Sequence, residues 1–224
     1  RYSPLPEINT KEQNSSSDAS HADRSSIFKY PYLILGAVAI FFHVGAQVIS
    51  IDTIINYAGT MGIELTAAKV FPSYTMSCTL VGYFLGIILI PKVLSQKRAL
   101  QIATTLGLLL SIGVIYLSAD VEIFTHKTDV SIWFLVMMGM PNALIYAGLW
   151  PLAIRNLGKY TNLGSSLLVM ALCGNAFLPV IYGAIADSFG ERLSYWVLVP
   201  CFLYLIFYAF KGHKIEHWSK SKAI

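Results

Sequence analysis

Residues 42–58 read FHVGAQVISIDTIINYA and lie in the first of several long apolar runs of the chain. Four side chains in this stretch can exchange hydrogen bonds, namely His43, Gln47, Asp52 and Asn56. An Asp at the centre of a membrane helix costs roughly 2.5–3.5 kcal/mol on insertion scales, so polar groups in such a run face protein or water. The stretch therefore predicts a membrane helix with a polar, functional side.

The composition of the whole chain indicates an integral membrane protein. Of its 224 residues, 55% are hydrophobic and 12% are charged, and the mean hydropathy is +0.60. A helix needs about 20 apolar residues to cross a hydrocarbon core roughly 30 Å thick. Runs of suitable length occur six times, at residues 32–55, 74–90, 100–119, 132–154, 166–186 and 195–210. We therefore expect an all-α membrane protein with six transmembrane helices.

The Lys and Arg residues outside these runs indicate the orientation of the chain. Thirteen lie on the side that holds both termini, and three lie on the other side, namely Lys69, Lys127 and Arg192. Cytoplasmic loops of membrane proteins carry an excess of Lys and Arg. This predicts a multi-pass protein of the plasma membrane with both termini in the cytoplasm. The basic pI near 8.9 then reflects membrane topology, and no clustered basic face or base-stacking module points to nucleic acid.

Residues 1–29 differ from the rest because they are rich in Ser, Asn, Asp and Lys and have no apolar periodicity. This composition is typical of a flexible linker. We expect a polar cytoplasmic linker at 1–29, a six-helix transmembrane domain at 30–212 and a cytoplasmic tail at 213–224. A linker followed by six spans predicts the second half of a twelve-span transporter, whose first six helices lie upstream. The alternative is a self-contained six-span subunit or scaffold that assembles with a partner and transports nothing itself.

The six runs divide into two sets of three, and polar or helix-weakening residues interrupt the first run of each set. Gly45 and Gln47 interrupt the run at 32–55. The run at 132–154 is interrupted by Gly139, Pro141, Asn142 and Gly148. Corresponding interruptions in two inverted repeats are a sequence pointer to the binding site of a transporter.

Three strings resemble one family of transporters: HVGAQ at 43–47, IRNLGKYTNLGSSLLVM at 154–170 and LPVIYGAIAD at 178–187. They are similar to the carboxy-terminal half of sugar transporters in the fucose–proton symporter family of the major facilitator superfamily, with a closer match to its bacterial glucose/galactose transporter branch. The resemblance covers about residues 30–210. It implies a twelve-helix fold of two halves, in a bacterial inner membrane, with a neutral monosaccharide bound between halves that rock. This chain would supply helices seven to twelve, and the amino-terminal half would be its partner.

Helical geometry divides the four polar residues of the first run into two pairs. At about 100° per residue, Gln47 lies within about 40° of His43, whereas Asp52 and Asn56 lie about 180° and 220° from it. Either the helix breaks between Gln47 and Asp52, or the pairs serve two surfaces. A rise of 1.5 Å per residue places Gln47 roughly 22 Å from the helix start and Asp52 roughly 30 Å, near the outer interface.

We assign Gln47, with His43 beside it, to a central sugar site. One amide offers a donor and an acceptor to neighbouring hydroxyls, and the alternative for Gln47 is a hydrogen bond between helices. His43 either takes part in proton coupling or donates to a backbone carbonyl and stays neutral. Asp52 and Asn56 are candidates for the outer gate, and Asp52 is also the sole candidate proton carrier in the runs. The resemblance places the coupling acids in the other half.

Asn142 and Tyr146 stand one turn apart on the same side of the fourth run. An aromatic ring can stack on the apolar face of a sugar while an amide binds its hydroxyls. The resemblance also implies an Asn at this position. The alternative is that Asn142 satisfies backbone groups freed by Pro141. In the fifth run, Asn175 is assigned either to substrate contact or to close packing beside Gly174.

The sequence carries no motif for catalysis or for a bound cofactor. It has no HExxH, no paired Cys ligands and no phosphate-binding glycine loop. Ser165 lies at a helix start, far from His43, which argues against an intramembrane serine protease. The three cysteines fall inside apolar runs: Cys78, Cys173 and Cys201. We therefore expect no enzyme activity, no metal and no cofactor, and a proton is the one co-transported species that the resemblance implies.

Overall fold

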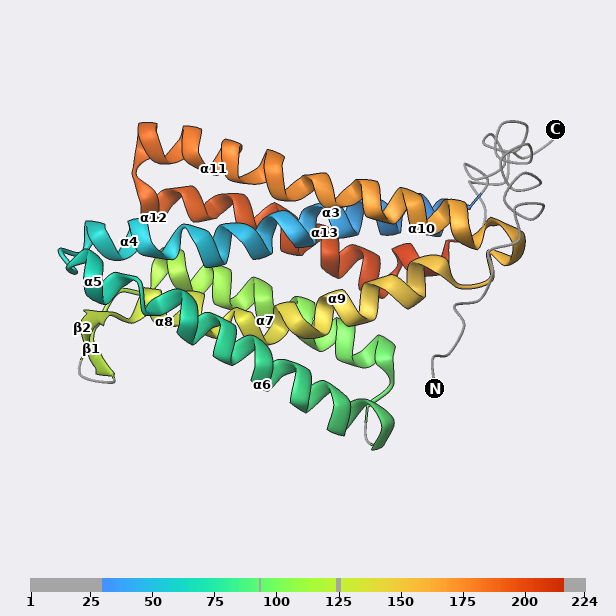
Figure 1. Ribbon diagram of the computed structural model, residues 1–224, viewed down its shortest axis with the longest axis horizontal. Helices are drawn as coiled ribbons and strands as arrows, with labels where there is room; N and C mark the ends of the chain where they lie inside the picture. Colours follow the sequence, from blue (N-terminus) through green and yellow to red (C-terminus); the bar gives the residue numbers. More distant parts are fainter. Residues whose placement is uncertain (1–29, 93, 124–125, 216–224) are drawn as a thin grey trace, which may run out of the picture.

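The computed structural model describes residues 30–92, 94–123 and 126–215. The linker expected at 1–29 and residues 216–224 of the expected tail lie outside the described residues. Within the described part, six candidate spans are long and apolar enough to cross a membrane, as expected: Pro31–Asp52, Leu65–Ile90, Gln96–Tyr116, Val130–Ile154, Thr161–Phe189 and Glu191–Lys214. They run side by side along the long axis of the molecule (Figure 1).

Single helices form the first and third spans, α5 (Leu65–Ala68) and α6 (Phe71–Lys92) form the second, and shorter elements joined end to end form the others. The long helices are α3 (Pro31–Asp52), α6 (Phe71–Lys92) and α7 (Gln96–Tyr116). The fourth span is α8 (Val130–Met137) and α9 (Gly139–Ile154). The fifth is α10 (Thr161–Met170), the 3-10 turn η2 (Ala171–Cys173) and α11 (Gly174–Phe189). The sixth is α12 (Glu191–Ser194), η3 (Tyr195–Val197) and α13 (Leu198–Phe210).

The remaining elements are short and lie at the ends of the bundle. Two helices follow α3, namely α4 (Ile54–Thr60) and α5 (Leu65–Ala68). Two 3-10 turns lie at the opposite end, η1 (Gly158–Tyr160) and η4 (Gly212–Lys214). The antiparallel hairpin of β1 (Asp120–Ile123) and β2 (His126–Asp129), with Asp120 opposite Asp129, was not expected in an all-α chain.

The structure places the helix breaks of the spans. Of the two alternatives for the first span, a break between Gln47 and Asp52 is not found, because α3 is continuous to Asp52 and the turn falls at Thr53. The Thr53 hydroxyl donates to the Ile49 carbonyl at 2.6 Å, which satisfies a backbone group at the helix end. Interruptions are also not confined to the first span of each set, since η2 interrupts the fifth span. The third helix ends at Tyr116, before the expected Ala119.

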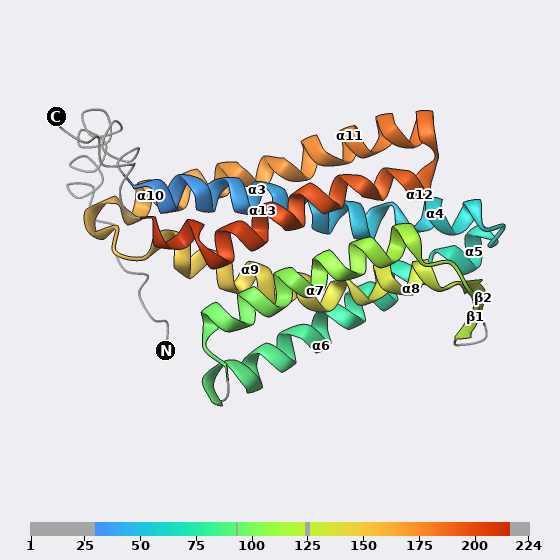
Figure 2. The same cartoon turned by 180° about the vertical axis from the view of Figure 1, so that it is seen from behind.

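The helices α3 and α9 form the centre of the bundle. They pack against each other, α11 packs on α3, and α6 packs on α9. Helices α7 and α13 form a second layer that covers α9 and α3 from behind (Figure 2). The spans that contain α6 and α11 are the least buried of the six. Their large apolar side chains are exposed, among them Phe84, Ile87, Phe177 and Val180.

Glycines allow α11 to approach α3 closely. A Cβ atom at Gly45 would lie 2.2 Å from the Leu178 Cδ1 atom and 2.7 Å from the Gly174 carbonyl oxygen. A Cβ atom at Gly174 would lie 2.1 Å from the Phe41 carbonyl oxygen. Small residues at such crossings are typical of membrane helix pairs. Gly174 therefore serves the close packing of α11 on α3.

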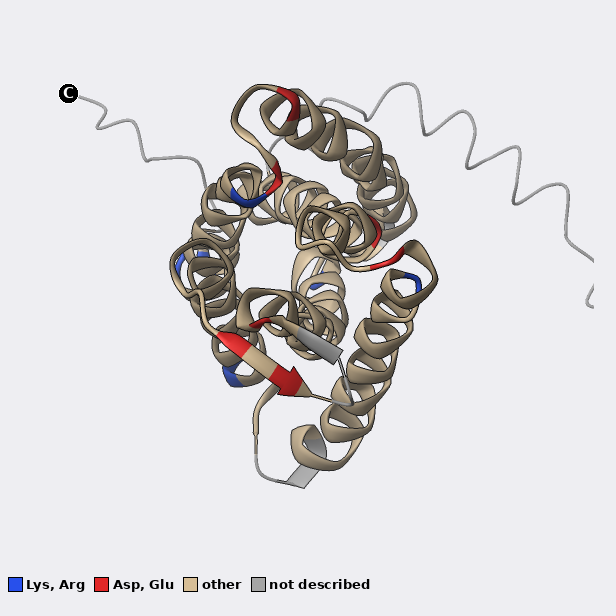
Figure 3. Ribbon diagram, turned by 90° about the vertical axis from the view of Figure 1, so that its left-hand side faces the viewer, with Lys and Arg blue, Asp and Glu red and all other residues tan. Residues whose placement is uncertain are grey.

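Charged residues separate strongly between the two ends of the bundle. All seven acidic residues of the described chain lie at the end that Figure 3 shows, namely Asp52, Glu64, Asp120, Glu122, Asp129, Asp187 and Glu191. Seven of the ten described Lys and Arg residues lie at or near the other end: Lys92, Lys97, Arg98, Arg155, Lys159, Lys211 and Lys214. We call these the acidic end and the basic end.

Gly45→Ala tests the crossing of α3 and α11. The added methyl group meets Leu178 and the Gly174 backbone, so we expect a loss of stability of about 1–3 kcal/mol, as in other overpacked cores. Gly183→Ala on α11 is the matched control because an added Cβ there meets nothing within 4 Å. Thermal unfolding in mild detergent measures both. Equal unfolding temperatures for Gly45→Ala and Gly183→Ala would contradict this packing.

Candidate functional site

A line of polar side chains follows the contact between α3 and α9. The Asn142 amide donates to the Ser50 hydroxyl at 3.4 Å, and the Ser50 hydroxyl donates to the backbone carbonyl of Gln47 at 2.8 Å. One to two turns nearer the basic end, the rings of His43 and Tyr146 lie 6.1 Å apart. Because the residue numbers rise on α3 as they fall on α9, the two helices run antiparallel. We call His43, Gln47, Ser50, Asn142 and Tyr146 the polar seam.

His43 is buried inside this bundle. Its exposed fraction is 0%, and neither ring nitrogen has a hydrogen-bond partner among the described residues. Of the two alternatives for His43, a bond to a backbone carbonyl is therefore not found in the described part of the chain. The ring of Tyr146 lies beside it, and the Trp150 ring follows 6.2 Å beyond Tyr146 toward the basic end. Toward the basic end the seam is thus continued by the rings of Tyr146 and Trp150, each of which has an apolar face and one polar group.

Asn142 and Gln47 differ in how their amides are used. Asn142 is 1% exposed, and its Oδ1 atom has no partner among the described residues although its Nδ2 atom binds Ser50. Its side-chain bond goes to Ser50 on α3, so the side chain acts between helices, and no bond from it to a backbone group freed by Pro141 is found among the described residues. Gln47 is half-buried, and no hydrogen bond from its amide is found in the described part of the chain.

The other predicted site residues lie apart from the seam. Asn175 is exposed on α11, next to the buried Gly174 that packs on α3. Asp52 and Asn56 are exposed at the acidic end, on either side of the turn at Thr53. The two pairs on the first span therefore serve two surfaces, which was one of the two alternatives. Ser50 was missed by sequence reasoning, although it stands one turn from Gln47 and two turns from His43 on the same side.

Tyrosine side chains connect four spans near the turn at Thr53. The hydroxyl of Tyr195 lies 2.8 Å from that of Thr53, and the hydroxyl of Tyr57 lies 2.7 Å from that of Ser131. The rings of Tyr57 and Tyr195 meet edge to face at 5.2 Å, and the Tyr182 ring lies 5.1 Å from that of Tyr195. These contacts join α4 to α8 and η3, and η3 in turn to α11, so the acidic end is held by hydrogen bonds as well as by packing.

Asp129 and Arg192 anchor the hairpin at the same end. The Arg192 guanidinium donates to the carbonyls of Ile115 at 3.1 Å and Leu117 at 2.6 Å, and lies 3.8 Å from the Asp129 carboxylate. Burial alone would raise the pKa of Asp129. Hydrogen bonds from Ser118 and from the Ser131 N–H, together with the Arg192 charge, outweigh burial and lower this pKa below its usual value.

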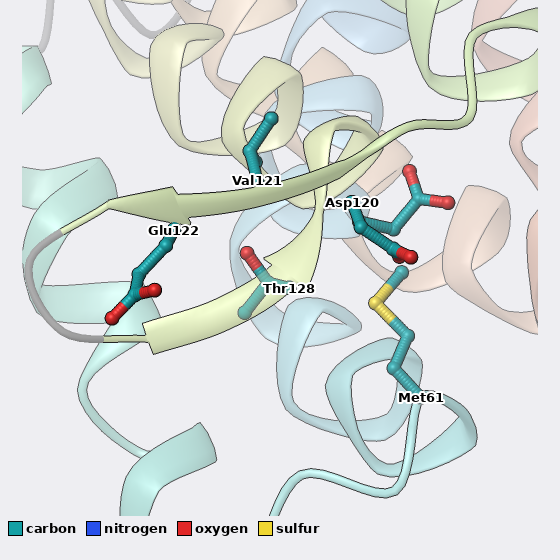
Figure 4. A pocket seen from close by; sticks show the side chains of 6 residues that line it. Met61, Asp120, Val121, Glu122 and Thr128 are labelled. Atoms are coloured by element: carbon teal, nitrogen blue, oxygen red, sulfur yellow. The ribbon is translucent and has the colours of Figure 1, made fainter.

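A pocket of about 550 Å³ opens beneath the hairpin (Figure 4). It is lined by Met61, Asp120, Val121, Glu122, Thr128 and Asp129. The Thr128 hydroxyl accepts the indole N–H of Trp133 at 2.8 Å, so it is already paired. No group of three His, Cys, Asp or Glu side chains in the described residues could hold a metal ion. The pocket therefore presents three carboxylates, those of Asp120, Glu122 and Asp129, at the acidic end of the bundle.

The fold matches that of a known class of transporters. The crystal structure of a major facilitator superfamily transporter, FucP, in the outward conformation superposes with a TM-score of 0.73 over 91% of this chain and 45% of that one, at 22% identity. A second structure, of the Escherichia coli fucose:proton symporter FucP (N162A), gives a TM-score of 0.72 at 22% identity, over 84% of this chain and 43% of that one. The described chain thus has the fold of one half of a major facilitator transporter.

Curated relatives by sequence agree with the resemblance to the fucose–proton symporter family. The chain is 28% identical over 198 residues to the glucose/galactose transporter of Brucella abortus, covering 87% of this chain and 46% of the relative. It is 27% identical to a putative glucose/galactose transporter of Helicobacter pylori, over 86% of this chain and 46% of the relative. The L-fucose-proton symporter of Escherichia coli K12 is 26% identical over 77% of this chain and 37% of the relative.

These relatives limit what the chain alone can be said to do. The chain spans about half the length of the curated relatives that it matches. Their names are those of transporters, in agreement with the expectation that the chain is not an enzyme. No protein-family model matches the chain.

Asp129→Asn tests the anchor at the acidic end. A depressed folded-state pKa contributes stability that is present above the unfolded value, about 3.9, and is lost as pH falls through the folded value. A hydrogen bond to a charged acceptor contributes roughly 1.5–3 kcal/mol to stability, and the neutral Asn side chain weakens the bonds that the Asp129 carboxylate accepts. We expect a lower unfolding temperature at pH 7 and a shallower decline below about pH 4.

Asp187→Asn is the matched control for Asp129→Asn, because Asp187 is exposed at the same end. It should leave the unfolding temperature unchanged at pH 7. The same outcome for Asp129→Asn would show that the anchor adds nothing to stability.

Proposed function

We propose that this chain forms the carboxy-terminal half of a bacterial transporter that moves a neutral monosaccharide by alternating access, with coupling to protons. The polar seam is the observation that carries this proposal. Within a bundle of apolar helices, the central pair α3 and α9 holds the half-buried amide of Gln47, the Asn142 amide with an unpartnered oxygen, and the ring of Tyr146. The fold and the names of the relatives support the same class.

The chemistry of the seam suits a neutral sugar. Amides can donate to one hydroxyl and accept from its neighbour, and the Tyr146 ring can stack on the C–H face of a pyranose. Every described acidic residue lies at the acidic end and none lies on the seam, so the seam offers no charge to bind an ion. A glucose-, galactose- or fucose-like substrate fits this donor set.

The second wall of the site comes from another six-helix half, the partner expected upstream of this chain. The exposed apolar faces of α6 and α11 flank the central helices, because α6 packs on α9 and α11 packs on α3. A surface of this kind on both sides of a polar seam suits an interface that closes around a substrate. In a self-contained six-span scaffold the buried polar groups of the seam would have no function.

Orientation in the membrane follows from the separation of charge. The basic end, with its excess of Lys and Arg, faces the cytoplasm of the bacterium and holds the first and last described residues, Tyr30 and Ile215. The acidic end then faces outward, where Asp52 and Asn56 line the mouth near the turn at Thr53. Water at this mouth lowers the cost of a charge on Asp52, which favours a gate position over a buried proton carrier.

Uptake of labelled glucose, galactose and fucose by the full-length transporter tests the sugar site. Gln47→Ala and Asn142→Ala each remove a hydrogen-bonding amide, and Ser50→Ala removes the contact that orients Asn142. A hydrogen bond contributes roughly 1 kcal/mol, so we expect initial rates about five- to tenfold lower. Thr105→Ala is the control, because Thr105 is exposed on α7 and bonds only to its own helix, at Gln101. Unchanged uptake by the Gln47 and Asn142 variants would contradict the site assignment.

An imposed pH gradient tests the coupling. We expect uptake to rise when the outside is acidic, and this dependence to persist in Asp52→Asn, because the coupling acids are assigned to the other half. His43→Gln should also keep the dependence, since no charged group of the described residues bonds the buried ring. Loss of the gradient response in Asp52→Asn alone would place coupling in this chain. No response in the wild type would remove the symport proposal.

A further inference from the structure

The outer face of α7 carries two apolar crevices that the sugar site does not use. One, of about 170 Å³, lies between α6, α7 and α9 and is lined only by apolar residues, among them Leu94, Ile102 and Leu106. The other, of about 440 Å³, lies between α7 and α13 and is lined by Gln101, Ile102, Thr105, Leu106, Leu109 and Phe210. Ile102 and Leu106 line both, so they form a ridge between two adjacent crevices.

Two cations stand at the basic-end mouth of these crevices. Arg98 precedes Ile102 by four residues, so it lies on the same face of α7, one turn nearer the basic end. Lys211 follows Phe210, which lines the second crevice. The Gln101 amide of α7 donates to the Ala209 carbonyl of α13 at 3.2 Å, so these two positions lie at the same height along the bundle. Both cationic residues are exposed.

These cations lack an acidic partner in the described part of the chain. All the described acidic residues lie at the opposite end of the bundle. No hydrogen bond or ion pair of the Arg98 guanidinium is found among the described residues, where only its backbone N–H bonds, to the Ser95 hydroxyl. Exposed positive charge therefore borders apolar crevices at the level where a membrane helix leaves the hydrocarbon core.

We propose that this face of α7 binds one anionic diacyl phospholipid. One acyl chain lies in each crevice, on either side of the Ile102–Leu106 ridge, and the headgroup phosphate pairs with Arg98 and Lys211. Basic pockets between helices at the cytoplasmic side of a membrane recognise anionic headgroups in this way. The cations and the second crevice lie on the layer that α7 and α13 form behind α9 and α3 (Figure 2), whereas the first crevice is bordered by α6 and α9 as well as by α7.

Native mass spectrometry of the full-length protein, delipidated and then titrated with phosphatidylglycerol or phosphatidylcholine, tests the proposal. We expect tighter binding of phosphatidylglycerol by the wild type, and a loss of about fivefold in affinity in each of Arg98→Gln and Lys211→Gln. Lys69→Gln is the matched control, since Lys69 is an exposed cation at the acidic end. It should bind phosphatidylglycerol like the wild type.

A second variant tests the acyl-chain contacts without changing charge. Thr105→Phe fills the crevice between α7 and α13 from an exposed position, so the fold is retained and binding of phosphatidylglycerol should fall. A single-chain lysophosphatidylglycerol should be less affected by this variant than the diacyl lipid. Equal binding of phosphatidylcholine and phosphatidylglycerol, or unchanged binding in the Arg98→Gln, Lys211→Gln double variant, would overturn the proposal.

Discussion

Polar side chains on the two central helices must be kept away from lipid, and the rest of the bundle is arranged around this constraint. Helix α3 carries His43, Gln47 and Ser50 in an otherwise apolar sequence, and α9 carries Asn142. Their burial requires close neighbours on several sides. Gly45 and Gly174 allow α11 to approach α3 with no room for a side chain, while α7 and α13 cover the other side of the pair.

The same constraint explains the state of the polar groups. Ser50 satisfies one Asn142 donor, but the Asn142 oxygen and both His43 nitrogens have no partner within the described residues. Buried polar groups without partners cost roughly 1–3 kcal/mol each. When a sugar hydroxyl bonds these unpartnered groups, this free energy is recovered. Without a ligand, the groups continue to destabilise the bundle. The seam is therefore better suited to binding than to holding helices together.

The sequence predicts the parts of this structure that depend on local pattern. Six apolar runs predict six spans, and polar residues at a helical spacing place His43 and Gln47 on one side of α3. The Ser50–Asn142 contact joins residues 92 apart, so no local pattern reveals it. Helical spacing alone left open whether the first helix breaks between Gln47 and Asp52, and the structure places the turn at Thr53, whereas Gly45 is a packing position against Leu178. Strand β1 alternates polar and apolar residues over only four positions, β2 has no apolar residue, and Asp129 at the end of β2 pairs with Arg192 from the sixth span.

The central claim is that the seam between α3 and α9 meets water and sugar. The most direct measurement is thiol labelling of Gln47→Cys in a full-length transporter whose other cysteines have been replaced, using a membrane-impermeant maleimide that reacts with thiolate in water. The account predicts labelling that slows when a transported sugar is added, while Ile112→Cys on the lipid-facing side of α7 stays unlabelled. A Gln47→Cys thiol that is inert, or that labels at the same rate with every sugar, would contradict it.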